Sequence, residues 1–93
     1  MKLERPAQAG TIESSDIQVT LSPAAEGNGI QIELVSPTFQ QYGGHIIQLI
    51  EKTVQSFGIE NATVFANDKG ALDCTILARL TTAVERATKK GGE

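Results

Sequence analysis

The stretch DIQVTLSP, residues 16–23, alternates apolar and polar side chains. The apolar residues at positions 17, 19 and 21 would lie on one face of a strand, and the polar residues between them on the other. Ser22-Pro23 ends the pattern, because proline has no backbone N–H to donate to a neighbouring strand. The stretch therefore predicts a half-buried strand.

A second alternating stretch follows a short loop. The sequence AAEGNG at residues 24–29 is typical of a turn, and Asn28-Gly29 adopts positive φ at little cost. Apolar and polar residues then alternate again from Ile30 to Leu34. Two alternating strands joined by a turn predict an N-terminal β-hairpin with a long tip.

Ser36-Pro37 predicts the start of a helix over residues 37–57. Serine is a favourable N-cap, and proline at the first helical position sacrifices no helical hydrogen bond. Apolar residues recur at helical spacing on one side: Phe39, Tyr42, Ile46, Leu49, Ile50, Val54 and Phe57. Gly43-Gly44 weakens this helix by about 1–2 kcal/mol relative to two alanines. The pair is typical of a bend or of close backbone packing.

The C-terminal part predicts one more strand and one more helix. ATVFA at residues 62–66 reads as a short strand, and the following NDKG as a turn. From Leu72, apolar residues recur every four positions, which predicts a helix over 72–88. Apolar residues between 72 and 80 also alternate, so a fourth strand ahead of a shorter helix remains an alternative.

These elements give an α+β fold with the order β-β-α-β-α. We expect one domain over residues 1–93, in which two helices pack on one face of a three-stranded sheet. Residues 1–10 follow neither the strand nor the helix period, so they are predicted to form a mobile arm. Residues 91–93 are predicted to be a frayed tail.

Composition limits the classes of function. The chain has 93 residues and a net charge of −3, and the first 50 residues hold all of that net charge. An acidic surface disfavours nucleic acid and favours docking on basic patches of proteins. The single cysteine excludes an internal disulfide and a thiolate metal cluster. With no apolar run of membrane-spanning length and no signal-peptide pattern, we expect a cytoplasmic protein without a membrane partner.

The candidate functional stretch is GTIESSD, residues 10–16, just before the first predicted strand. It offers the hydroxyls of Ser14 and Ser15 between the carboxylates of Glu13 and Asp16. A serine nucleophile needs a nearby base, and no histidine lies within thirty residues along the chain. The stretch therefore indicates a serine that another protein recognises or modifies, rather than a catalytic one.

Other reactive residues give weak signals. His45 and Cys74 are the only histidine and cysteine, and a Cys–His nucleophile pair is conceivable from their types alone. We expect instead that His45 lies on a helix flank and that Cys74 packs as a small apolar residue. The carboxylates are scattered along the chain, so we expect no metal site and no catalytic residue.

Three blocks of sequence carry a resemblance over essentially the whole chain. MKLERPA at residues 1–7, AGTIESSD at 9–16 and DKGALDCT at 68–75 are similar to the acyl carrier (gamma) subunit of bacterial citrate lyase. The carrier subunit of malonate decarboxylase is more distantly similar, with Gly-Ser-Gly-Asp where this chain has residues 13–16. That alignment selects Ser14 over Ser15.

The resemblance implies a non-catalytic carrier. It implies that Ser14 holds phosphoribosyl dephospho-coenzyme A through a phosphodiester, and that the thiol of this group carries acetyl and citryl. The implied partners are the alpha (acyl transferase) and beta (citryl lyase) subunits, a prosthetic-group transferase and an acetate ligase that acetylates the thiol. The Asp-Ser-Leu motif of ordinary acyl carrier proteins is absent. The alternatives are a malonate decarboxylase-type carrier and a structural subunit that carries nothing.

Overall fold

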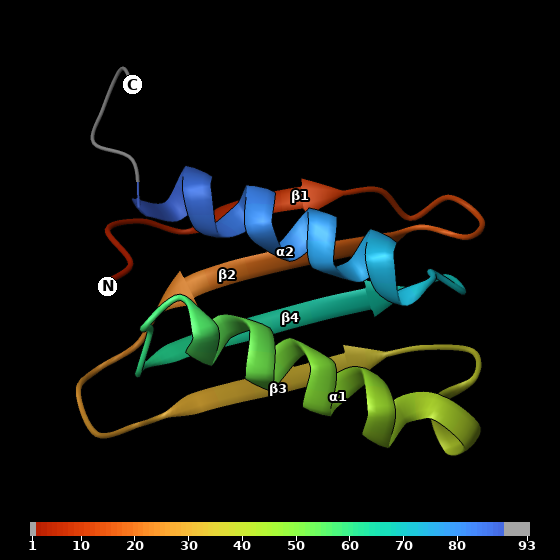
Figure 1. Ribbon diagram of the computed structural model, residues 1–93, viewed down its shortest axis with the longest axis horizontal. Helices are drawn as coiled ribbons and strands as arrows, with labels where there is room; N and C mark the ends of the chain where they lie inside the picture. Colours follow the sequence, from red (N-terminus) through yellow and green to blue (C-terminus); the bar gives the residue numbers. More distant parts are fainter. Residues whose placement is uncertain (1, 89–93) are drawn as a thin grey trace.

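Four strands form one sheet in the order β1-β2-β4-β3, and two helices cover one of its faces (Figure 1). The computed structural model describes residues 2–88. Along the chain the elements are β1 (Ala7–Gly10), β2 (Ile17–Pro23), β3 (Ile30–Val35), α1 (Phe39–Ser56), β4 (Ala62–Asp68) and α2 (Asp73–Thr88). The predicted α+β class, the order of the five predicted elements and the placement of both helices on one face are confirmed.

The predicted N-terminal hairpin is wrong in its pairing. β4 lies between β2 and β3, antiparallel to β2 and parallel to β3. The strand–helix–strand run of β3, α1 and β4 is a βαβ unit, in which the helix returns the chain so that the two strands run in the same direction. The connection after β2 therefore crosses the end of β4, and Asn61 Oδ1 accepts hydrogen bonds from Gly27 N and Gly29 N there.

The structure also corrects the predicted mobile arm. Ala7–Gly10 form β1, which pairs antiparallel with β2 and adds a strand to the three predicted. Leu3 is buried against the core, and Glu4 N donates a 2.8 Å hydrogen bond to the carbonyl of Ala87 at the end of α2. Arg86 Nη1 donates to Gln8 O at 2.8 Å, so the N-terminal segment is attached to both the sheet and the helix.

The helices follow the predicted stripes with two differences. In α1, Ile46, Ile50 and Val54 are buried, but Phe39 and Tyr42 at its start remain exposed. The predicted N-cap at Ser36 is wrong, because α1 begins at Phe39 with Thr38 as its N-cap. The Ser36 hydroxyl accepts a 3.2 Å hydrogen bond from Thr38 N and donates to the buried Asp68 carboxylate at 2.8 Å.

The second helix is confirmed over the alternative of a fourth strand at 72–80. α2 buries Ile76, Leu80 and Val84 against β1 and β2, as its four-residue repeat predicted. The predicted frayed tail at 91–93 lies outside the described residues. In the part of the chain that the structure describes, neither helix is both long and apolar enough to cross a membrane.

Candidate functional site

Ser14 lies in the loop of residues 11–16 that joins β1 to β2, at one end of the sheet (Figure 1). Residues 12–15 of this loop are all exposed. No hydrogen bond between residues 2 and 88 engages the Ser14 hydroxyl, whereas Asp16 at the end of the same loop is held by several. The loop thus presents two exposed serines, Ser14 and Ser15, and no hydrogen bond within the described residues engages either hydroxyl.

The backbone on either side of Ser14 is fixed. Asp16 N donates to Glu13 O at 3.2 Å, which closes a turn around Ser14 and Ser15. Ser15 has a φ of 65°, in the left-handed region that short polar residues tolerate in turns. Ser15 N donates to Lys69 O at 2.8 Å, so the turn is attached to the segment that follows β4. Ser14 is therefore exposed on a loop with a defined conformation.

Asp16 forms the base of this loop. Arg79 on α2 donates two 3.0 Å hydrogen bonds to the Asp16 carboxylate, one from Nε and one from Nη2. The hydroxyl of Thr11 and the backbone N–H of Ile17 donate two more, both of 2.7 Å. Chiefly because of the Arg79 hydrogen bonds, the pKa of Asp16 lies well below its usual range. The Asp16 side chain is only 13% exposed, so it contributes little to an acidic surface beside Ser14.

Gly10 permits the tight approach of β1 to β2 before the loop. Its φ of +90° is a conformation that side chains rarely adopt, and a Cβ there would overlap the carbonyl oxygen of Ile17. Position 10, four residues before Ser14, therefore requires glycine. Other residues rarely adopt this backbone conformation, and their Cβ would overlap Ile17.

The remaining reactive residues do not assemble a catalytic centre within the described chain. His45 Nε2 lies 2.8 Å from Asp73 Oδ2, and no described hydrogen bond joins His45 to Cys74. Cys74 is exposed, so the prediction that it packs as an apolar residue is wrong. Between residues 2 and 88 the structure gathers no group of three or more His, Cys, Asp or Glu side chains suited to a metal ion.

The sequence singled out the loop that contains Ser14 and Asp16 but did not indicate which residues hold this loop. Arg79 is 63 positions from Asp16, and Lys69 contributes through its backbone, which carries no sequence signal. The fold brings both to the loop because β4 lies beside β2 and α2 returns across it.

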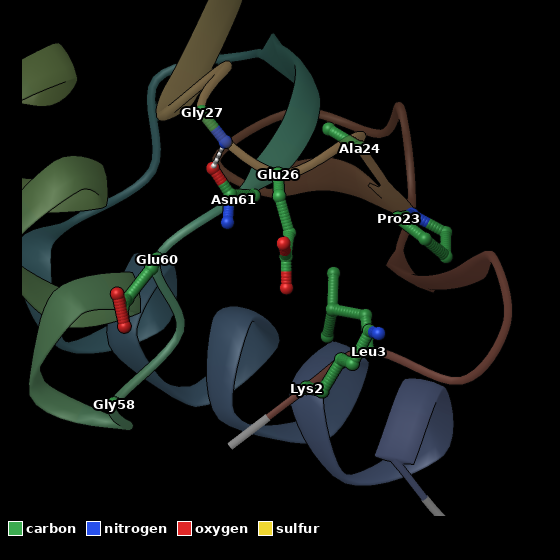
Figure 2. A pocket seen from close by; sticks show the side chains of 9 residues that line it. All are labelled: Lys2, Leu3, Pro23, Ala24, Glu26, Gly27, Gly58, Glu60 and Asn61. Carbon is green, nitrogen blue, oxygen red and sulfur yellow. Dashed lines mark hydrogen bonds between the residues drawn. The ribbon is translucent and has the colours of Figure 1, made fainter.

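A hollow of about 640 Å³ lies at the opposite end of the sheet (Figure 2). Leu3 and the side chain of Glu26 point into it, and the Gly27–Asn61 hydrogen bond forms part of its wall. β2 has seven residues, so roughly 20 Å of strand separates this hollow from the loop of Ser14. Ser14 and this hollow are therefore separate features.

The site fits the covalent attachment of a group. An exposed serine hydroxyl on a fixed turn can be reached by a modifying enzyme. The sheet and core do not have to open, because Ile17 and the residues that follow it in β2 keep their pairing with β4.

Comparisons with known proteins agree with a carrier. The family model of the malonate decarboxylase delta subunit (MdcD), an acyl carrier protein family, matches residues 4–87. The citrate lyase acyl carrier protein of Lacticaseibacillus casei is 56% identical over 88 residues, covering 95% of this chain and 85% of the relative. That of Halothermothrix orenii is 45% identical over 93 residues, covering 100% and 97%.

A solved structure shares the fold. A chain from the crystal structure of a Pseudomonas malonate decarboxylase hetero-tetramer in complex with malonate superposes with a TM-score of 0.76 and 19% identity. The match covers 94% of this chain and 88% of that one.

The relatives are named as acyl carrier proteins, which bears on both the catalytic role and the family of this chain. Acyl carrier proteins are non-catalytic subunits, so the prediction that this chain is a carrier and not an enzyme is confirmed. Acyl carriers hold their cargo on a covalently attached prosthetic group, and they act as parts of multi-subunit complexes. With 45–56% identity over most of its length, the chain belongs to the family of acyl carrier proteins that includes the citrate lyase carrier and the malonate decarboxylase delta subunit.

Proposed function

We propose that this chain is the acyl carrier subunit of citrate lyase and that Ser14 holds phosphoribosyl dephospho-coenzyme A through a phosphodiester. The observation that carries the proposal is the exposed Ser14 hydroxyl on a turn whose backbone is fixed by Lys69 and whose base is fixed by Arg79. A carrier needs this combination, because its cargo must move while its body stays folded.

The structure indicates what the chain itself contributes to attachment. The Ser14 oxygen has to lose its proton and displace diphosphate from the incoming group. The neighbouring Asp16 is a poor base, because Arg79 and Thr11 occupy its oxygens and its pKa is lowered. We propose that the base comes from the prosthetic-group transferase and that the chain supplies an accessible, positioned hydroxyl.

Once attached, the group supplies a thiol on a long flexible chain, which holds acetyl and then citryl while partner subunits act. On the loaded carrier the alpha subunit would exchange acetyl for citryl with release of acetate, and the beta subunit would cleave citryl to oxaloacetate and leave acetyl on the thiol. An acetate ligase acetylates the thiol before the first turnover. The protein's contribution is effective concentration, since a tethered acyl group meets both active sites without dissociating. We expect such a carrier to act in the cytoplasm.

Two other readings make different predictions. A malonate decarboxylase-type carrier would accept the same group but serve other partners, and it is supported by the family model and the shared fold. The 45–56% identity to citrate lyase carriers favours the citrate lyase assignment. A structural subunit without cargo would need no free hydroxyl at Ser14.

Reconstitution separates these readings. The carrier is produced with the prosthetic-group transferase, acetylated, and mixed with citrate lyase alpha and beta subunits, and oxaloacetate formation from citrate is measured. We expect activity with the loaded carrier and none with Ser14→Ala. Loaded carrier that supports malonate decarboxylation but not citrate cleavage would point to the malonate assignment, and activity with Ser14→Ala would overturn the attachment site.

A further inference from the structure

Several large apolar side chains remain exposed at the end of the molecule that holds Ser14. Ile12 in the loop is 57% exposed, Leu72 just before α2 is 70% exposed, and Tyr42 in the first turn of α1 is 55% exposed. An apolar surface left open beside a functional residue is typical of a binding site. These side chains therefore require an explanation that the packing of the core does not provide.

Leu72 and Tyr42 line a hollow between the starts of the two helices. Its volume is about 420 Å³, within the range of about 300–1,000 Å³ typical of ligand pockets. One wall comes from α1, with Tyr42 and His45, and the other from residues 70–73. His45 Nε2 and Asp73 Oδ2, which belong to the two walls, form a 2.8 Å hydrogen bond. The hollow combines apolar walls with a few hydrogen-bonding groups at its rim.

This hollow begins close to Ser14. Ser15 N donates to Lys69 O at 2.8 Å, and the next residue, Gly70, is part of the hollow's wall. By standard bond lengths, the path from Ser14 Cα through this hydrogen bond to Gly70 Cα is at most about 8 Å. A coenzyme A-type group attached to Ser14 is longer than this distance, so it can fold back onto the hollow.

We propose that this hollow receives the pantetheine segment of the group on Ser14 while the carrier moves between partners, an inference that rests on the proposed function. Pantetheine alternates methyl and methylene groups with two amides. The apolar groups match Leu72 and Tyr42, and the amides match the Tyr42 hydroxyl and the His45–Asp73 pair. Asp68, which also lines the hollow, already accepts hydrogen bonds from the Ser36 hydroxyl and Ala71 N, and the pantetheine segment is uncharged, so this carboxylate does not oppose docking.

Covalent attachment makes a shallow site sufficient. A tethered segment faces the hollow at high effective concentration, so weak contacts keep it docked for part of the time. The same weakness lets an enzyme withdraw the arm without a large energetic cost. The hollow therefore protects the thioester end from solvent between visits and releases it on demand.

The chain contains a reporter for this docking. Tyr42 is the only tyrosine and there is no tryptophan, so intrinsic fluorescence excited near the tyrosine band arises from one wall of the hollow. We would compare apo and loaded carrier without partner subunits, using intact mass to establish loading and acrylamide quenching to measure access to Tyr42. We expect loading to lower the quenching constant at least twofold at every protein concentration.

Matched variants localise the effect. Leu72→Ser removes an apolar wall of the hollow and should abolish most of the difference between apo and loaded protein. Ile12→Ser removes a comparably exposed apolar side chain that does not line the hollow and should leave the difference intact. A thermal melt confirms that both variants fold.

The outcomes separate the two proposals. Loading seen by mass with an unchanged quenching constant overturns the docking of the arm and leaves the proposed function standing. Failure to load overturns the proposed function and the docking with it. Protection that rises with protein concentration shows a second copy in the hollow, and protection that appears only with a partner subunit shows a protein interface. Either of these results also overturns the inference.

Discussion

The guanidinium of Arg79 on α2 donates hydrogen bonds of 3.0 Å from Nε and Nη2 to the two carboxylate oxygens of Asp16. Asp16 lies two residues after Ser14. The Arg79–Asp16 pair joins the second helix to the loop that presents the candidate attachment site. Because Asp16 also accepts a hydrogen bond from Thr11 at the other end of the loop, one carboxylate fixes both ends of the turn.

The Asp16–Arg79 pair predicts a pH dependence of stability. The pKa of Asp16 is lower in the folded protein than its value of about 3.9 in an unfolded chain. The unfolded state therefore binds more protons near pH 4, and this contribution to stability is complete above about pH 5 and is lost as pH falls further. We expect the free energy of unfolding, measured by urea titration from about pH 5 to pH 2, to fall less steeply in Asp16→Asn than in the unaltered protein.

Arg79→Met should also make the free energy of unfolding fall less steeply as the pH is lowered from about 5 to 2. The reason is that the Arg79 hydrogen bonds are the largest cause of the lowered pKa of Asp16. Glu26→Gln, an exposed carboxylate at the other end of the sheet, serves as the control and should leave the slope unchanged. Parallel curves for Asp16→Asn and the unaltered protein would contradict the assigned role of the pair.

Two glycines with the same backbone angle give a second prediction. Gly10 and Gly27 both have a φ of +90°, but a Cβ on Gly27 meets nothing within 4 Å, whereas one on Gly10 overlaps the Ile17 carbonyl. Gly27→Ala should cost about 1–2 kcal/mol from the backbone angle alone. Gly10→Ala should cost about 1–3 kcal/mol more, because the strands have to move apart. Equal losses in chemical denaturation would show that β1 does not approach β2 as described.

The adjacent glycines of α1 provide a third comparison. Gly44 has open space around its Cβ position, so Gly44→Ala should stabilise the protein by about 1 kcal/mol through helix propensity. A Cβ on Gly43 would lie 3.0 Å from the ring of Phe39, which would offset the gain unless the ring turns away. The shift in thermal midpoint should therefore be larger for Gly44→Ala, and the reverse order would contradict the packing of Phe39 over Gly43.

We expect Glu13 to steer the carrier toward its modifying enzyme by electrostatic attraction. Asp16 is neutralised by Arg79, so Glu13 is the exposed carboxylate next to Ser14. A transferase that binds a phosphate-rich coenzyme A derivative needs cations near its site, and these can attract Glu13. At low salt we expect Glu13→Lys to lower the kcat/KM of the transferase for this carrier by a factor of up to about ten.

A salt series tests this prediction of steering. The difference between Glu13→Lys and the unaltered carrier should vanish toward 1 M salt, where the screening length is about 3 Å. Glu26→Lys changes net charge equally at the far end of the molecule and should have a much smaller effect. Equal kcat/KM for Glu13→Lys and the unaltered protein at low salt would rule out steering by this residue.

Local periodicity was sufficient to predict the elements but not their partners. The alternation in β2 and β3 and the four-residue repeat of α2 record which side chains face the core, so each element could be predicted from its own residues. Alternation does not specify which strand lies alongside. Two alternating strands in succession therefore predict a hairpin, whereas the strand–helix–strand order of β3, α1 and β4 gives a parallel pair.

The errors at the N-terminus have a similar origin. β1 has the sequence AQAG, in which alanine and glycine have low strand propensity, and it is ordered by pairing with β2 and by contacts with α2. The candidate loop could be singled out because its residues are contiguous in the sequence, whereas the choice of Ser14 within it came from the resemblance and stays a prediction. The support of this loop by Arg79 could not be predicted, because 63 residues separate that side chain from Asp16.

The central claim is tested most directly by locating the attached group. Carrier produced with the prosthetic-group transferase is digested, and the mass of a peptide containing residues 6–23 is measured and fragmented. We predict one phosphoribosyl dephospho-coenzyme A group on Ser14, complete loss of loading in Ser14→Ala, and retained loading in the control Ser15→Ala. A group located on Ser15, or loading that persists in Ser14→Ala, would contradict the account.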